Sequence, residues 1–167
     1  MTGNQTVTYT YDASGRKLRK QSATLGTTNY VNGIHYKTDG VIDFIRTEEG
    51  IARNHSNSYS YEYNLTDHLG NVRVSFYRHP SSRLLDDLQR DDYYAFGQRK
   101  VAKEGIDKYL YNGKELQEEL GQLDYGARFY DPVIGCFNTT DPMNLKTDFT
   151  PNRMHNYTDN TSVKIRK

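Results

Sequence analysis

Short alternating segments joined by tight-turn signals dominate the first half of the sequence. In residues 6–20, Tyr9 and Tyr11 alternate with threonines, which is the period of two expected for a strand with one buried face. Asp12–Gly15 then supplies a turn, because aspartate can bond its own backbone and glycine tolerates positive φ. The pattern predicts a β-hairpin, whose return strand sets Leu18 among basic residues expected to face water.

The same pattern recurs further along the chain. Residues 28–46 contain the turn signals Asn32-Gly33 and Asp39-Gly40, and residues 59–77 turn at Asp67–Asn71 between alternating aromatic residues and valines. One hairpin is marginal in water because it buries a single face, whereas hairpins placed edge to edge form one sheet. We therefore expect an all-β chain of antiparallel hairpin repeats, with exposed edges unless something continues the sheet.

Two segments depart from this alternation and suggest one or two short helices. In residues 81–92, three leucines at helical spacing predict either a single helical turn or a loose loop. Residues Gly113–Leu120 are expected to form a short helix, because Leu116 and Leu120 stand one turn apart. Between these segments, Tyr93–Gly97 repeats the hairpin pattern in shortened form.

The composition favours strands with one wet face over a conventional apolar core. Only 35% of the residues are hydrophobic, the mean hydropathy is −0.91, and tryptophan is absent. Yet the chain contains 15 tyrosines, whereas disordered segments are poor in aromatic residues. A tyrosine ring can be buried while its hydroxyl stays hydrated or bonded, which suits a narrow sheet.

Charge and hydropathy narrow the set of partners. The formal net charge is +1, so no overall field favours nucleic acid or an acidic membrane surface. The sequence contains neither a long unbroken apolar run nor a basic start followed by one, so neither a membrane span nor a signal peptide is expected. The chain is either cytoplasmic or part of a larger exported protein.

The stretch Tyr109–Pro142 is the densest in aromatic residues and glycines. Rings alternating with turn residues indicate short strands pinned by tight turns. Two Asp-Pro steps, Asp131-Pro132 and Asp141-Pro142, close the stretch. Such a stretch is either catalytic machinery or a structural plug.

Four motifs in order resemble those of rearrangement-hotspot (RHS) proteins, a family built from Tyr-Asp (YD) repeats, in the form found in Bacteroidetes-like bacteria. Tyr9–Arg16 resembles the YD repeat, Thr66–Arg73 the family's Asp-His-Leu-Gly-Asn segment, and Asp92–Gly97 its Tyr-Tyr-Pro-Phe-Gly segment. Tyr109–Pro142 is similar to the RHS repeat-associated core. The resemblance covers residues 6–165, and four motifs in order are far more specific than one.

This resemblance implies a shell. RHS and related toxin components wind YD repeats into a spiral antiparallel β-sheet that forms a hollow cage; the associated core closes one end, and a variable C-terminal toxin sits inside. On this basis the chain divides into YD-type hairpin repeats (1–80), a connector with a short strand (81–108), the core (109–160) and a divergent tail (161–167). The expected partners are the remaining shell repeats or a toxin cargo. The expected location is secreted or at the cell surface, within a larger protein.

In several RHS proteins the core is also an autoprotease that uses aspartates and cleaves after a downstream segment. The resemblance makes Asp131 and Asp141 the candidate catalytic pair, with Arg128 as an ion-pair partner. Such a pair shares a proton in a partly dry site. The alternative is that each aspartate caps a turn, since the residue before proline is extended and aspartate accepts backbone bonds.

Departures from the family pattern favour a structural role without catalysis. Cys136 stands where the family usually has arginine, and Thr150–Tyr157 departs from the family's usual sequence at this place. Asn160–Lys167 replaces the region where the cleavage segment would begin. We therefore expect a truncated piece of the shell, a plug that helps to encapsulate a toxin, with an aspartic autoprotease as the alternative.

No other chemistry is indicated by the sequence. Cys136 has no recognisable base and is expected to be inert. The five histidines lack metal-ligand spacing and no nucleotide motif occurs, so no metal or cofactor is expected. Exposed tyrosines either bind carbohydrate or another protein, or pair across strands within the sheet.

Overall fold

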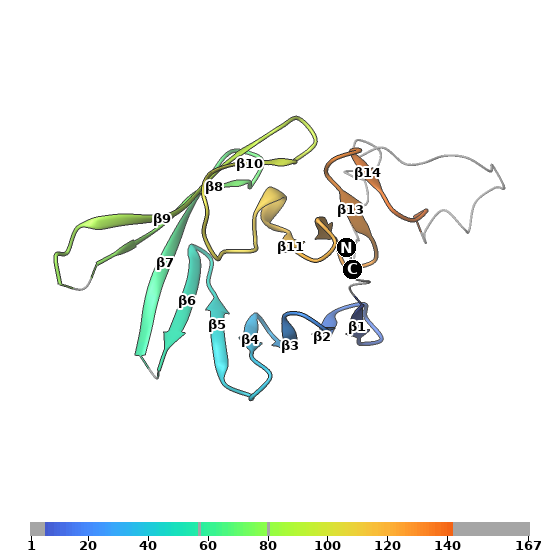
Figure 1. Ribbon diagram of the computed structural model, residues 1–167, viewed down its shortest axis with the longest axis horizontal. Coiled ribbons are helices and arrows are strands. Elements are labelled where there is room, and N and C mark those ends of the chain that lie inside the picture. Colours follow the sequence, from blue (N-terminus) through green and yellow to red (C-terminus); the bar gives the residue numbers. More distant parts are fainter. Residues whose placement is uncertain (1–5, 57, 80, 142–167) are drawn as a thin grey trace.

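The computed structural model describes residues 6–56, 58–79 and 81–141, which form two antiparallel sheets (Figure 1). The all-β expectation is confirmed, and no described helix is long and apolar enough to cross a membrane. In both sheets the strands follow one another in sequence order. The ten-stranded sheet consists of β1 (Val7–Tyr11), β2 (Lys17–Ser22), β3 (Gly26–Val31), β4 (Ile34–Tyr36), β5 (Ile42–Arg46), β6 (Gly50–His55), β7 (Ser58–Thr66), β8 (Val72–Arg78), β9 (Leu85–Tyr93) and β10 (Arg99–Lys103). The four-stranded sheet follows a 3-10 turn, η1 (Tyr111–Gly113), and consists of β11 (Glu115–Gln117), β12 (Gln122–Asp124), β13 (Phe129–Asp131) and β14 (Cys136–Phe137).

The predicted hairpins form because local bonds close their turns. Asp12 Oδ1 accepts hydrogen bonds from the backbone N–H groups of Ser14 and Arg16, both at 2.9 Å. The bond from the Ser14 hydroxyl, followed by that from the Arg16 N–H, lowers the pKa of Asp12 to about 2. Between β3 and β4, Asn32 and Gly33 take φ +49° and +84°, the left-handed pair that a two-residue hairpin turn needs. The hairpin predictions are therefore confirmed.

The prediction of a helical turn or a loop over residues 81–92 is confirmed as a loop only for residues 81–84 and is wrong beyond them, because Leu85–Tyr93 forms the nine-residue strand β9. The alternation of buried and exposed residues in β9 is not apparent in the sequence, because its inward-facing residues are polar. Gln89 and Asp91 are each 1% exposed, whereas Arg90 and Asp92 are exposed. A search for alternating apolar residues therefore misses this strand. With β10 it forms a full hairpin in place of the shortened one expected.

The helix predicted over Gly113–Leu120 is also wrong, since this stretch forms β11 and a turn. Asn112, just before it, takes φ +51° in the left-handed region, which interrupts helical winding. Leu116 pairs instead with Leu123 of β12. Tertiary pairing overrides the helical spacing of the leucines. Only the short turn η1 is helical among the described residues.

The larger sheet curls so that residues 107–141, called the inner segment, lie within its curve (Figure 1). The buried aromatic core belongs to this segment: Tyr111, Leu123 and Tyr130 are 5%, 2% and 0% exposed. Tyr93 of β9 packs against this core from the larger sheet. The core therefore stabilises the inner segment and contacts the larger sheet through its last hairpin.

The concave face of the larger sheet is mostly polar where it meets the inner segment. Register aligns one inward-facing residue from each of five neighbouring strands, namely Tyr30, His35, Phe44, Arg53 and Ser60. The neighbouring inward residue Glu62 accepts two bonds from Arg53, at 2.5 and 3.0 Å, and both residues are buried. Such buried charges need partners, and the sheet supplies them within its own face.

Candidate functional site

A buried polar seam joins the concave face of the larger sheet to the inner segment. On the sheet side it contains charged and aromatic residues of β2 to β5, and on the other side carboxylates and tyrosines of the inner segment. We define the seam by Lys17, Lys20, Tyr30 and His35 from the sheet and by Tyr109, Glu115, Glu119 and Asp124 from the inner segment.

Lys17 is the centre of this seam. Its Nζ lies 2.6 Å from Glu115 Oε2 and 2.6 Å from Asp124 Oδ2, two carboxylates that face each other across β11 and β12. The three side chains are 9%, 9% and 7% exposed. Tyr30 donates its hydroxyl proton to Glu115 Oε1 at 2.9 Å. One ammonium group therefore holds two buried carboxylates together, in charge-assisted bonds that are stronger than neutral ones.

His35 lies next to this ion cluster and is 3% exposed. Its ring stacks on Phe44 at 4.1 Å, and its Nε2 shares a 3.0 Å hydrogen bond with the Tyr109 hydroxyl. Burial, and then the nearby cations Arg46 and Lys17, lower the pKa of His35 from 6.5 to about 3. Histidine at this position is therefore neutral throughout the physiological range.

The tyrosines of the seam are held in their neutral form as well. Burial, and then the Glu115 carboxylate, raise the pKa of the Tyr30 hydroxyl far above its ordinary value. The same two causes, in the same order, raise the pKa of Tyr109. The Arg46 guanidinium lies 3.7 Å from the Tyr109 ring centroid, a cation–π contact from the sheet to the inner segment. The Tyr30 and Tyr109 hydroxyls therefore act as neutral hydrogen-bonding groups within the seam.

A second ion pair lies further along the seam. Lys20 Nζ is 2.7 Å from Glu119 Oε2, and the two side chains are 6% and 2% exposed. Burial opposes ionisation of Glu119, but the hydrogen bonds to its carboxylate, led by that from Lys20, together outweigh burial and lower the pKa of the carboxyl. Tyr9 of β1 also contacts the inner segment, donating its hydroxyl to Gln117 Oε1 at 3.2 Å.

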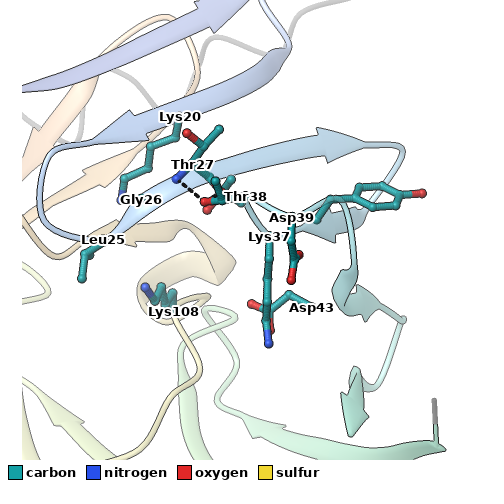
Figure 2. A pocket seen from close by; sticks show the side chains of 11 residues that line it. Lys20, Leu25, Gly26, Thr27, Lys37, Thr38, Asp39, Asp43 and Lys108 are labelled. Atoms are coloured by element: carbon teal, nitrogen blue, oxygen red, sulfur yellow. Dashed lines mark hydrogen bonds and ion pairs between the residues drawn. The ribbon is translucent and has the colours of Figure 1, made fainter. Parts of the chain in front are cut away.

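Beside Lys20 lies a cleft of about 540 Å³ between the larger sheet and the inner segment (Figure 2). Lysines approach it from both sides, yet each already has a carboxylate partner. Lys37 pairs with Asp43 at 3.4 Å and Lys108 with Glu118 at 2.7 Å. The cleft therefore offers little net positive charge to an anionic ligand.

Asp107 fastens the beginning of the inner segment to β7 and β9. Its Oδ2 accepts a bond from Asn64 Nδ2 at 2.7 Å, and its backbone N–H donates to Gln89 Oε1 at 3.0 Å. Burial raises the pKa of Asp107, although the bond from the Tyr109 N–H opposes this shift. The inner segment is thus bonded to the larger sheet outside the seam as well, at β7 and β9.

The turn between β9 and β10 approaches the inner segment so closely that only glycine fits. A Cβ at Gly97 would lie 2.5 Å from Tyr111 Cδ1, and Gly97 takes φ +86°. Nearby, the Asn112 N–H donates to Asn71 Oδ1 at 2.8 Å. Close backbone contact therefore supplements the ion pairs of the seam.

The residues predicted for an aspartic site occupy two different settings. Asp141 Oδ2 lies 3.1 Å from Arg128 Nη2, and their side chains are 9% and 8% exposed. Asp131 Oδ1 accepts bonds from the N–H groups of Val133 at 2.9 Å and Ile134 at 3.4 Å. Asp131 therefore has the geometry of the turn cap that the sequence offered as the alternative, while Asp141 is half of a buried ion pair with the expected arginine.

Cys136 is half-buried in β14, where it is the register partner of Asp131. Within the described ranges, no three side chains of histidine, cysteine, aspartate or glutamate group together as metal ligands would. Thr150–Tyr157 and Asn160–Lys167, on which the comparison with the family's cleavage segment depends, lie outside the described residues.

The sequence did not point to the residues of the seam. Lys17 and Lys20 were expected to face water, but both are largely buried, while Leu18 between them is 41% exposed. Glu115 belonged to the predicted helix. The partners of Lys17 are 98 and 107 residues away in the chain, so no local spacing marks them.

Comparisons of the sequence with known proteins give a partial match. No family model matches the sequence. In an alignment of 83 residues that covers 47% of the chain, it is 37% identical to a protein of Aedes aegypti named salivary gland surface protein 1, of which this match covers 2%.

Solved structures of toxin complexes cover most of the chain. A crystal structure of TcdB2-TccC3 matches 82% of it with a TM-score of 0.64 and 17% identity, and a TcdB2-TccC3-Cdc42 structure matches 81% with a TM-score of 0.63 and 18% identity. A Tc holotoxin pore of Photorhabdus luminescens matches 85% with a TM-score of 0.62 and 16% identity. The chain spans 8% of the length of each of these chains. At these identities the similarity shows a shared fold.

Proposed function

We propose that this chain is a segment of an RHS-type β-shell and has no catalytic activity of its own. Its ten-stranded sheet forms part of the wall, and its inner segment closes one end around a toxin cargo. Its partners are the remaining shell repeats and the cargo, and the assembly works outside the cell or at its surface. In this proposal residues 1–80 are hairpin repeats, 81–108 a connector, 109–160 the core and 161–167 a tail.

The observation that best supports this role is the way the inner segment is held. Lys17 and Lys20 of the wall reach buried carboxylates of the inner segment at 2.6 to 2.7 Å. Removing one partner of a buried ion pair leaves an uncompensated charge, so such pairs disfavour alternative positions of the segment. A closing element needs one fixed position against the wall, and this seam provides it.

The test is to co-express the full chain with a YD-repeat protein and a toxin-sized protein taken from the neighbouring genes; if these genes encode neither, the shell role is wrong. We expect the three to co-purify and the small protein to resist protease as long as the complex is intact. If the small protein is digested as fast in the complex as alone, the shell role is wrong. The purified chain should also keep a single intact mass during incubation. Specific self-cleavage between residues 141 and 160 that Asp141→Asn abolishes would overturn the non-catalytic part.

An aspartic autoprotease is the second candidate, and the buried Arg128–Asp141 pair favours it. A carboxylate 9% exposed beside a guanidinium is the kind of desolvated group that catalytic sites use. Inserting the family's cleavage segment after Asn160 tests this activity directly. Cleavage that depends on Asp141 supports it. A fusion that stays intact, even when Cys136→Arg restores the family's usual residue, contradicts it.

A further inference from the structure

The cluster around Lys17 brings one amino group into contact with two carboxyl groups. Glu115 and Asp124 are register partners on β11 and β12, so their side chains leave the same face of the smaller sheet. Like charges placed directly opposite each other destabilise a strand pair. Here the Lys17 Nζ lies 2.6 Å from a carboxylate oxygen of each residue. A lysine amine is also a nucleophile once it has lost its proton, so these contacts allow chemistry as well as ion pairing.

The three side chains of this cluster are shielded from water. They are at most 9% exposed. The Lys17 Nζ lies 4.6 Å from the centroid of the Tyr30 ring and 5.7 Å from that of the Tyr9 ring. Because burial disfavours charged groups, the transfer of a proton from the ammonium group to a carboxylate, which leaves two neutral groups, costs less free energy here than in water. The surroundings therefore favour formation of a free amine beside a carboxyl group.

The two carboxylates are bonded differently, which distinguishes their roles. Asp124 Oδ1 accepts a 2.7 Å hydrogen bond from the Gly126 N–H, while its Oδ2 contacts the amine. An N–H donor at one oxygen stabilises the negative charge that develops there when an amine adds to the carboxyl carbon. Glu115 Oε1 instead accepts the Tyr30 hydroxyl bond at 2.9 Å, which fixes the other oxygen of Glu115 beside Nζ. Asp124 is thus placed to be attacked and Glu115 to carry protons.

We propose that Lys17 and Asp124 form an intramolecular isopeptide bond, with Glu115 as the catalytic proton carrier. Glu115 Oε2 takes a proton from the ammonium group, and the free amine adds to Asp124 Cγ. Glu115 returns this proton to Asp124 Oδ2, and a second proton moves from the nitrogen to the same oxygen by the same route. The Cγ–Oδ2 bond then breaks and releases one water molecule. The product is an amide, Glu115 returns to its starting state, and no oxidant, reductant or cofactor is consumed.

This bond joins β2 of the larger sheet to β12 of the inner segment, 107 residues later in the chain. A cross-link that closes so long a loop restricts the unfolded chain and stabilises the folded one. The reaction takes place once in each chain as it folds. It therefore gives the chain no turnover, is compatible with a non-catalytic shell role, and does not depend on that role.

Intact-mass spectrometry of the purified full chain tests the bond. We expect a single mass that is lower than the sequence mass by one water and does not change on incubation, because the bond forms during folding. Trypsin should fail to cut after Lys17 and should yield residues 17–19 joined to residues 115–128, with fragmentation placing the link at Asp124. A folded chain without this joined peptide would overturn the proposal, and so would a link at Glu115.

Two variants separate the bond from the ion pair. Lys17→Arg keeps a cation beside both carboxylates but cannot form the amide, so it should show no loss of water and should be less stable in urea than the unchanged chain. Glu115→Gln keeps an acceptor for the Tyr30 hydroxyl but cannot carry the proton, so the linked fraction should fall at least about tenfold. Circular dichroism shows whether each variant is folded. Loss of water in Lys17→Arg, or full linkage in Glu115→Gln, would contradict the assigned roles.

Lys20→Arg is the matched control, because Lys20 belongs to the other buried ion pair of the seam. Among the described residues, Lys20 has one carboxylate within ion-pair distance, that of Glu119 at 2.7 Å. This pair therefore lacks the second carboxylate that would carry the proton, and it is expected to stay an ion pair. Lys20→Arg should form the Lys17–Asp124 bond as completely as the unchanged chain. If a folded Lys20→Arg chain loses the bond as Lys17→Arg does, the assignment to Lys17 is wrong.

Discussion

His35 makes the stability of the chain sensitive to acid, and the size of the effect follows from its burial. The folded state keeps the ring neutral down to a pKa of about 3, whereas the unfolded state has the ordinary pKa of 6.5. Between these values the unfolded chain binds a proton that the folded chain does not. Stability contributed by neutral His35 is therefore fully present above pH 6.5 and is lost progressively as the pH falls toward the folded pKa.

Each pH unit inside this window costs at most about 1.4 kcal/mol. Lowering the pH from about 7.5 to about 5 should thus reduce the free energy of unfolding by about 2 kcal/mol through this group alone. The figure depends mainly on the unfolded pKa, because pH 5 lies well above the folded one. The lowered pKa of Glu119 adds its own pH dependence, so the comparison must isolate the histidine.

His35→Gln isolates it, since glutamine does not titrate and can still bond the Tyr109 hydroxyl. Urea unfolding at the two pH values, followed by circular dichroism, gives the loss of stability for each protein. We expect the loss to be about 2 kcal/mol smaller in His35→Gln than in the unchanged chain. His68→Gln, at an exposed turn position, should behave like the unchanged chain. If His35→Gln loses as much stability on acidification as the unchanged chain, the reasoning about its burial is wrong.

Three further changes test the packing of the two sheets. Lys17→Met leaves Glu115 and Asp124 buried without their shared cation and should cost about 3–5 kcal/mol in urea unfolding; a cost below 1 kcal/mol would mean that the seam is hydrated. Gly50→Ala places a Cβ 2.1 Å from a backbone oxygen of β7 and should lower Tm markedly. The control is Gly40→Ala, because a Cβ at Gly40 has open space around it. This control should lower the free energy of unfolding by only about 1 kcal/mol, through backbone strain. Leu123→Ala should destabilise the inner segment by about 2–5 kcal/mol. Amide hydrogen exchange should then accelerate more in β11 to β13 than in β6 to β8. Equal acceleration in both sheets would show that they unfold as one unit.

The hairpins could be predicted from the sequence because their signals are local. Asp12 bonds the N–H groups of residues two and four positions later, and Asn32-Gly33 supplies its own left-handed turn. Such bonds form within a few residues and depend little on the rest of the fold. The all-β class and the aromatic core of the inner segment follow from the same local patterns.

The missed elements share one physical cause. In β9 the buried residues at alternate positions are polar. In Gly113–Leu120 the leucines have helical spacing, although the stretch forms a strand and a turn. In both, pairing with a neighbouring strand determines the backbone, and that neighbour is not visible in the segment itself. The predicted helices failed for this reason.

The sequence alone determined the order of the hairpins, the turn role open to Asp131 and the aromatic character of the inner segment. Only the tertiary structure decided that two lysines of a basic strand are buried against carboxylates about a hundred residues away. It also decided which face of β7 carries tyrosines into solvent. The reason is that the burial of a side chain and the partners of its charge depend on distant parts of the chain. The identity of a lysine or a tyrosine does not show whether it faces water or another sheet.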